Sequence, residues 1–305
     1  RGPSDGMWKL EDLGWFDCSS RLASRYPARA AGSDFTSQLT YVWDPNFRGG
    51  RFTPNGNTWW LYENATSQLI LGADGGAEKS VAMSADDLPW IDVVGLANST
   101  SVGSRGGIVL STPSGWFAGY DNLTSFDGSQ MDVVGATDLS NLFAGDSMLD
   151  TLAGVRDWDT SSVTDFSGVF KGVSALTNEG GFYQLDGWST VSATDFSSMF
   201  EGASGLSDLS PLARWATGNV QNFSSMFKDC VSLEDQSPIR NWNTAAANNM
   251  SYMFAGCSNL KYLDLSQWNM KGRGMSLTGM LDGCGDLTQI KTGESTVLAG
   301  TGLSD

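Results

Sequence analysis

Three of the four cysteines recur at a fixed interval of 27 residues: Cys230, Cys257 and Cys284. Thiolates bind metals where several converge, typically in close C-x-x-C pairs, and the sequence has no such pair. Earlier copies of the same position hold Asp146, Val173 and Ala203, so the position favours a small residue. We therefore expect buried, unreactive thiols. A disulfide between two of them would leave an odd thiol, and Cys18 stands alone, so the redox compartment stays open.

Catalytic chemistry has little to build on, because the chain contains no histidine. That absence excludes histidine-based triads, histidine metal ligands and the usual proton carrier near neutral pH. No P-loop, dinucleotide-binding glycine motif or nucleophile elbow occurs. Paired carboxylates for glycoside hydrolysis stay possible, since their separation in space is not visible. Asp157 and Asp159 flank Trp158, but as repeat positions they suggest solvated turns. We expect no enzyme, no metal and no cofactor.

Tryptophans are the remaining residues suited to binding. Five of them follow a regular beat: Trp158, Trp188, Trp215, Trp242 and Trp268. They could form an exposed strip that stacks on sugar rings, but we favour a buried ladder. Trp59 and Trp60 are neighbours on a predicted strand, so one of them should face outward unless it is covered. Packing is the default for this pair, and sugar binding is the alternative.

The net charge of the chain limits which classes of partner it can bind. The chain has 305 residues, a formal charge of −16 and 40% hydrophobic residues, which is a globular composition. Its negative field would repel nucleic acid and anionic membrane surfaces, so we expect neither as a partner. No apolar run approaches the length of about 20 residues that a membrane helix needs. No signal peptide opens the chain, and Arg1-Gly2-Pro3 suggests a piece of a longer protein, with export left open.

The elements that must position these residues are internal repeats. A phenylalanine, usually after Met, recurs at intervals of 27, 30, 27 and 27, with Leu281 as a sixth member after a further 27: Phe143, Phe170, Phe200, Phe227 and Phe254. Leucines six residues downstream keep the same register, and the tryptophans follow them. Several independent positions share one period, which indicates a solenoid.

Each repeat predicts a short helix followed by a strand. Six residues suited to helix N-caps stand before the Met-Phe positions: Asp138, Asp165, Asp195, Asn222, Asn249 and Ser276. Met250, Met253, Phe254 and Cys257 would form one apolar helix face. A glycine suited to a left-handed turn follows in most copies, with Asp229 as the exception. The run from Leu260 to Trp268 then matches the strand phrase of leucine-rich repeats.

The segments "MFAGCSNLKYLDLSQWN", "MFKDCVSL" and "WDTSSVTDFSGVF" resemble the BspA-like leucine-rich-repeat family of bacterial surface proteins, in the branch with Met-Phe-x-x-Cys and Trp-Asn-Thr repeats. The resemblance covers about residues 121–290. It implies an extracellular location at a bacterial cell surface, with an anchor outside this sequence. It also implies adhesion to host proteins or glycans, or to other microbes; the lack of a long apolar run predicts no membrane insertion of this part of the protein.

The predicted fold is an α/β repeat, a leucine-rich-repeat-like solenoid of about six turns of ~27 residues with a small β-rich N-terminal cap. We divide the chain into a Trp-rich module and cap at 1–120, the solenoid at 121–293 and a loose tail at 294–305. In the first module, Trp59–Tyr62 and Leu69–Leu71 predict a hairpin. Residues 37–43 and 106–111 are further strand candidates, and residues 7–16 a short helix.

The candidate binding site is a polar strip on the outward side of the predicted strands. Side chains two and four residues before each Trp should point outward, because neighbours on a strand alternate. From this strip we select as ligand-binding candidates Arg156, Gln184, Asp186, Arg240 and Asp264. The expected partner is a surface protein or glycan. A structural spacer is the main alternative, and a carbohydrate-active module with the Trp-rich region as its site is a third.

Overall fold

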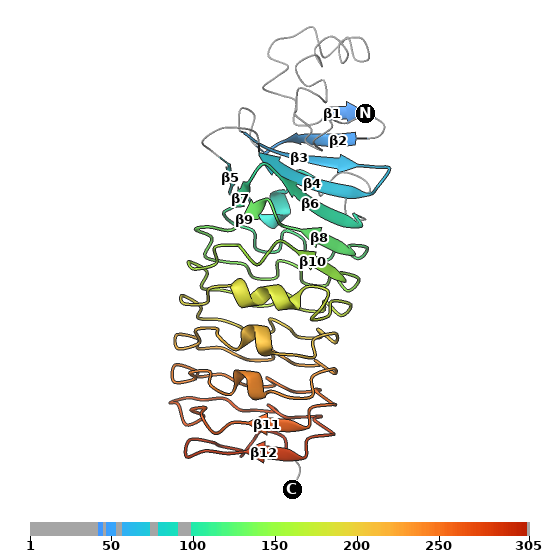
Figure 1. Ribbon diagram of the computed structural model, residues 1–305. Coiled ribbons are helices and arrows are strands. Elements are labelled where there is room, and N and C mark those ends of the chain that lie inside the picture. Colours follow the sequence, from blue (N-terminus) through green and yellow to red (C-terminus); the bar gives the residue numbers. More distant parts are fainter. Residues whose placement is uncertain (1–41, 45–46, 53–56, 74–78, 91–98, 304–305) are drawn as a thin grey trace, which may run out of the picture.

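The chain winds into a column of stacked coils (Figure 1). A computed structural model describes residues 42–44, 47–52, 57–73, 79–90 and 99–303. The described part starts with strand β1 at one end of the column and finishes beside β12 at the other. The helix predicted at residues 7–16 lies outside these ranges, as do residues 37–41 of one strand candidate.

Strands dominate the N-terminal end. Four antiparallel strands come first: β1 (Val42–Asp44), β2 (Phe47–Arg51), β3 (Thr58–Glu63) and β4 (Gln68–Ala73). Three parallel strands continue the same sheet: β6 (Ser101–Arg105), β8 (Ser125–Asp127) and β10 (Thr151–Ala153). The β3–β4 pair confirms the predicted hairpin. Parallel stacking thus starts with β4 and β6, before the predicted division at residue 120.

A second, three-stranded parallel sheet covers another side of the first coils. It contains β5 (Ser80–Val81), β7 (Ile108–Leu110) and β9 (Met131–Asp132), and β7 confirms the strand predicted at 106–111. A 3₁₀ turn, η1 (Ala85–Asp87), follows β5. In Figure 1 this sheet lies on the opposite side of the column from β8 and β10.

The strand side of the later coils differs from the prediction. Only the last two described coils have strands there, β11 (Tyr262–Asp264) and β12 (Gln289–Lys291). The three coils before them have 3₁₀ turns instead: η3 (Phe182–Gly187), η4 (Ser210–Leu212) and η5 (Ser237–Ile239). Pro211 and Pro238 lack the N–H that a strand ladder needs. The segment from Leu176 to Trp188, which contains η3, is three residues longer than its counterparts, which accounts for the 30-residue interval.

The predicted helices are wrong. Residues of the Met-Phe segments form consecutive tight turns, and the chain is a mostly-β solenoid of about eight turns rather than about six. Alternate N–H groups donate to the neighbouring coil, as from Phe143 to the Val169 carbonyl at 2.9 Å. The intervening ones close turns, as from Ala144 to the Asn141 carbonyl at 3.1 Å. Every second donor is thereby used between coils, so a run of i→i−4 helical bonds cannot form.

The residues predicted as N-caps keep part of their expected role. The Asp165 and Asp195 carboxylates each accept an N–H from the residue two positions on, at 2.8 and 2.7 Å. The same residues pair in parallel bridges from coil to coil. They therefore stabilise turns at the start of each segment, where Asx side chains are favoured, instead of helix ends.

Left-handed backbone recurs at the predicted glycines. Gly145, Gly172, Gly202 and Gly256 have φ between 74° and 88°, and Asp229, the exception in sequence, has the same conformation at φ 60°. An L-residue pays a steric penalty there that glycine avoids. The repeat therefore demands this conformation in every coil, whichever residue occupies it.

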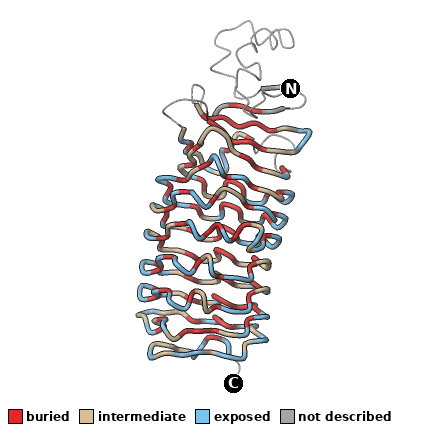
Figure 2. The backbone as a smooth tube through the Cα atoms, in the orientation of Figure 1, coloured by how far each residue is buried: buried red, intermediate tan, exposed pale blue. Residues whose placement is uncertain are grey.

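Aromatic ladders fill the interior, and buried segments recur in every coil (Figure 2). Phe170, Phe200 and Phe227 stack with successive centroids 5.7 Å apart and ring planes within 9°. The ladder starts one coil earlier than predicted, because Phe117 stacks on Phe143 at 5.7 Å. Sequence comparison missed that coil because Trp116 precedes Phe117 where later coils have mostly Met.

The repeat tryptophans form the predicted buried ladder. Each indole N–H donates to a backbone carbonyl of the preceding coil, as from Trp188 to Val155 at 2.8 Å and from Trp242 to Leu212 at 3.0 Å. All five rings are at most 6% exposed. An exposed sugar-stacking strip of these residues is therefore ruled out.

The two ends of the column bear on two expectations. Trp59 and Trp60 are both buried, as the packing default predicts, and Trp60 packs against Trp90 at a centroid distance of 6.1 Å. The pair therefore offers no outward aromatic face. At the other end, the predicted loose tail lies across the last coil, where Gly300 and Thr301 accept N–H groups from Gly279 and Leu281.

The recurring positions with left-handed backbone lead to a stability prediction. Gly202→Ala should lower the free energy of unfolding by about 1 kcal/mol, because it forces an L-residue to φ 76°. The added methyl would meet only ordinary van der Waals contacts, at 3.5 Å, so the effect reports on backbone strain. Asp229→Gly is the matched control and should be neutral or slightly stabilising. Urea denaturation measures both, and an unchanged Gly202→Ala variant would contradict this account.

Candidate binding surface

The predicted strip lies along the side of the column that carries β10, η3, η4, η5 and β11. We call this side the strip face, defined by the residues that stand two and four positions before each repeat Trp: Gly154, Arg156, Gln184, Asp186, Pro211, Ala213, Pro238, Arg240, Asp264 and Ser266. Four of them are exposed, namely Arg156, Asp186, Ala213 and Arg240. The strip face is thus partly the polar surface that the sequence predicts.

Arg156 and Asp186 are brought together from adjacent coils. The guanidinium Nη2 lies 2.9 Å from the Asp186 carboxylate, with side chains 56% and 41% exposed. An ion pair this exposed contributes at most about 1 kcal/mol to stability. Its polar atoms therefore stay accessible to a partner that offers similar groups.

Gln184 and Asp264 were expected to face solvent, and this expectation is wrong: they are 5% and 2% exposed. The Gln184 side-chain oxygen accepts the Val155 N–H at 3.2 Å, and its amide donates to the Leu152 carbonyl. In η3 the chain turns instead of alternating, so the fourth residue before Trp188 points inward. Gln184 thereby replaces the backbone partners that a strand would supply.

Asp264 is held by a similar local network. Its carboxylate accepts the N–H and the hydroxyl of Ser266 at 3.0 and 2.6 Å, and it lies 3.1 Å from the Lys291 Nζ. Burial alone would raise the pKa of Asp264, but these hydrogen bonds and the Lys291 charge outweigh it and lower the pKa below its usual value. The carboxylate stays ionised and already engaged.

Arg240 is exposed, and its Nη1 donates to the Ser237 carbonyl at 3.2 Å within the same turn. Arg214, which the strip prediction missed, is exposed one coil earlier. It stands one residue before Trp215, a position that is exposed in the other coils as well, for example at Asp157 and Asn241. The strip prediction missed it because it assumed strict strand alternation, in which neighbouring residues point to opposite faces.

The other chemical candidates are buried or engaged. The Cys230, Cys257 and Cys284 thiols donate to the backbone carbonyls of Phe200, Phe227 and Phe254 in the preceding coils, at 3.0–3.1 Å. Burial raises the pKa of all three thiols, that of Cys284 to about 11. They carry no disulfide, and Cys18 lies outside the described residues.

The two acidic candidates beside Trp158 lie at the surface. Asp157 and Asp159 are exposed, and hydrogen bonds from Ser161 lower the pKa of Asp159. In the described ranges, no group of three or more Cys, Asp or Glu side chains is arranged to hold a metal ion.

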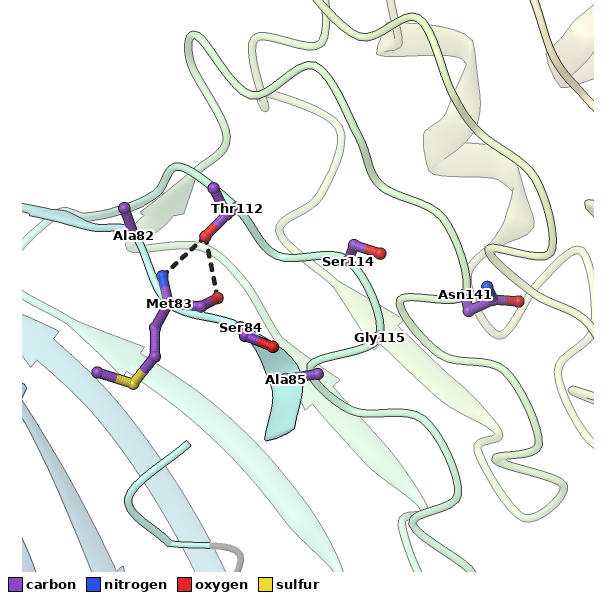
Figure 3. Close-up of a pocket in the computed structure, with 8 residues that line it drawn as sticks. All are labelled: Ala82, Met83, Ser84, Ala85, Thr112, Ser114, Gly115 and Asn141. Carbon is purple, nitrogen blue, oxygen red and sulfur yellow. Dashed lines mark hydrogen bonds between the residues drawn. The ribbon is translucent and has the colours of Figure 1, made fainter. Parts of the chain in front are cut away.

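A shallow hollow of about 610 Å³ opens beside η1 (Figure 3). The Thr112 hydroxyl accepts the Met83 N–H at 2.7 Å and donates to the Met83 carbonyl at 2.9 Å, which ties the η1 segment to the neighbouring coil. The residues that line the hollow are Ala82, Met83, Ser84, Ala85, Thr112, Ser114, Gly115 and Asn141. None of them titrates, so the hollow has no acid or base for catalysis.

The stacked coils, the buried aromatic ladders and the exposed polar side chains define the class of protein. It is a repeat solenoid whose accessible polar groups lie on its outer faces. The described ranges contain no helix long and apolar enough to cross a bilayer.

The chain belongs to the family described as "Mycoplasma protein of unknown function, DUF285", whose model matches two overlapping stretches, residues 114–210 and 178–292. The BspA-like family is a more specific assignment than this family match, and it stays a prediction.

Other comparisons add little. A solved structure, that of a leucine rich cell surface protein from Faecalibacterium prausnitzii A2-165, is 10% identical and covers 84% of this chain and 95% of its own, with a TM-score of 0.18. A likeness this weak carries no conclusion about fold or function. No curated protein matches the chain.

The Gln184 network generates a prediction. Gln184→Leu keeps the volume but leaves the Val155 N–H and the Leu152 carbonyl without their partner, and should lower the free energy of unfolding by about 2 kcal/mol. Tyr183→Ala, at the exposed neighbouring position, should change it by less than about 0.5 kcal/mol. Equal effects in chemical denaturation would show that Gln184 does not have this structural role.

A second prediction concerns Asp146, which is fully buried. Its Oδ1 accepts the Tyr120 N–H at 2.8 Å, and its Oδ2 has no hydrogen-bond partner among the described residues. Burial raises the pKa of Asp146 from 3.8 to about 9. Between these values the folded chain holds a proton that the unfolded chain releases, so stability should fall as pH rises, by at most about 1.4 kcal/mol per pH unit.

Asp146→Asn should remove this slope, because the amide keeps an acceptor for Tyr120 and cannot ionise. Urea denaturation of both proteins at a series of pH values measures it. Parallel pH dependence in the two proteins would contradict a neutral buried carboxyl.

Proposed function

We propose that this chain is a non-catalytic binding module at a bacterial cell surface, and that its strip face adheres to host proteins or glycans. The observation that carries the proposal is the strip face itself, where exposed charged side chains repeat along a solenoid held by hydrogen bonds between coils. Solenoids use such faces as extended binding surfaces, and many modest contacts add up along them. Arginine suits this role, since its planar guanidinium binds carboxylate and sulfate groups through paired hydrogen bonds.

An extracellular location fits a surface in which the exposed groups are polar and the thiols are buried. The non-catalytic part of the proposal rests on the chemistry of the exposed faces. The exposed Asp208 and Asp235 carboxylates accept hydrogen bonds from serines of their own turns, and no histidine is available to move protons near neutral pH.

The test uses an array of glycans and extracellular matrix proteins probed with the purified chain. Arg156→Ala combined with Arg240→Ala should weaken binding to any ligand found by about tenfold or more, because two guanidinium contacts are lost. Arg273→Ala is the matched control, since Arg273 is exposed but lies beyond Trp268, off the strip face. Unchanged affinity of the double variant would exclude the strip face as the contact surface. Turnover of any polysaccharide on the array would overturn the non-catalytic assignment.

A spacer role is the second candidate, and the shape of the column favours it. Because β1 and β12 lie at opposite ends (Figure 1), segments joined to these ends would be held apart. A chain that binds nothing on the array would support the spacer over the adhesin.

A further inference from the structure

The strip face has charges of opposite sign on its two borders. In the coils of η4 and η5 the chain enters the face at Asp208 and Asp235 and leaves it at Arg214 and Arg240. All four side chains are exposed, and none of them forms an ion pair within the described ranges. The two borders therefore present unpaired acids on one side and unpaired arginines on the other.

Coil stacking aligns the two acids in a column parallel to the solenoid axis, and the two arginines stand one position apart at the other border. The segments Leu206–Trp215 and Leu233–Trp242 have equal length, so Asp208 and Asp235 occupy the same position in successive coils. Each acid is separated from the arginine of its own coil by five or six residues that include a 3₁₀ turn, a span on the order of 10 Å. In neither coil does the acid form an ion pair with the arginine of its own coil.

Between these two borders, the surface of the η4 and η5 coils consists of small or conformationally restricted side chains. Pro211 and Pro238 lie there half-buried, with Ala213 exposed beside them. Proline loses little side-chain freedom on contact, and small side chains let another surface approach closely. A flat centre between two charged borders suits a flat partner that carries the reverse order of charges.

We propose that a second copy of this chain docks on the strip face, about a two-fold axis parallel to the solenoid axis. Rotation by 180° about such an axis exchanges the borders, so that Asp208 and Asp235 of each copy face Arg214 and Arg240 of the other at the same height. This inference rests on the proposed function, because it names the partner of the same face: the chain itself, in homotypic adhesion.

Arg214 and Arg240 are the cations of residues 206–242 that form no ion pair with another described residue, whereas Lys228 between them is paired. Four lysines of the solenoid, Lys171, Lys228, Lys261 and Lys291, already pair with carboxylates of a neighbouring coil. Two copies of net charge −16 repel each other at long range, and salt at 0.15 M screens that repulsion beyond about 8 Å. Contact pairs on the strip face lie within this distance and are screened less.

A charge-swap experiment tests the proposal by sedimentation velocity at physiological salt. The wild type should self-associate reversibly as its concentration rises. Arg214→Glu with Arg240→Glu makes both borders acidic, and Asp208→Lys with Asp235→Lys makes both borders basic. Each double variant alone should associate at least about tenfold more weakly, because like charges meet at every contact. An equimolar mixture of the two should restore association, as a mixed dimer.

Controls separate this effect from net charge and from folding. Lys271→Glu with Arg273→Glu lies off the strip face and changes the net charge from −16 to −20, as Arg214→Glu with Arg240→Glu does. This control should leave association nearly unchanged. Asp208 and Asp235 also accept N–H groups from Ser210 and Ser237, so the lysine variants could misfold. Asp208→Asn with Asp235→Asn keeps those acceptors, removes the charge and should weaken association as well.

Three results would overturn the inference: a monomeric wild type at all concentrations, a mixture that fails to restore association, or equal weakening by the off-face control. Failure of this inference differs from failure of the proposed function. A monomeric chain whose array ligand still depends on Arg156 keeps the adhesive function with a different partner. A dimer that depends on the face, with no array ligand at all, keeps the homotypic inference and removes adhesion to foreign molecules.

Discussion

Backbone hydrogen bonding between successive coils is the constraint on which the rest of the molecule depends. Alternate N–H groups of the turn segments donate to the next coil, which requires adjacent coils to lie in register at strand spacing. The remaining donors close tight turns within a coil, and a left-handed residue is needed at the end of each segment. Helix is excluded by this arrangement, although the apolar positions of the sequence have helical spacing.

Because the coils stack in register, residues at the same repeat position lie directly above one another in the interior. Each side chain must therefore pack against its counterparts in the two neighbouring coils. Aromatic rings satisfy this demand by stacking, and the repeat tryptophans add a hydrogen bond to the preceding coil. Small slots are filled by thiols that donate to backbone carbonyls. Asp146 occupies one of these slots at the price of a carboxyl that must stay protonated, and it marks the place where regular coils meet the irregular N-terminal end.

The same register turns the outer surface into columns of charge. Lysines and carboxylates at one position in adjacent coils neutralise each other, as Lys171, Glu201 and Lys228 do. In the η4 coil, where a 3₁₀ turn replaces a strand, Asp208 and Arg214 form no ion pair with any residue that the structure describes. The unpaired charges on which the proposed docking depends therefore lie in coils without strands on the strip face.

The sequence by itself determined the solenoid, its hairpin near the N-terminal end, and the inward positions, including Trp188 and Cys257. These depend on a period and on side-chain types that repeat in every copy. Only the tertiary structure decided the outward face. Gln184 turns inward because inserted residues give its coil a 3₁₀ turn in place of a strand. Asp264 turns inward at the end of β11, where Ser266 and Lys291 hold its carboxylate. A periodic sequence specifies which residues recur together, whereas the direction of each outward side chain depends on the backbone that the neighbouring coils impose.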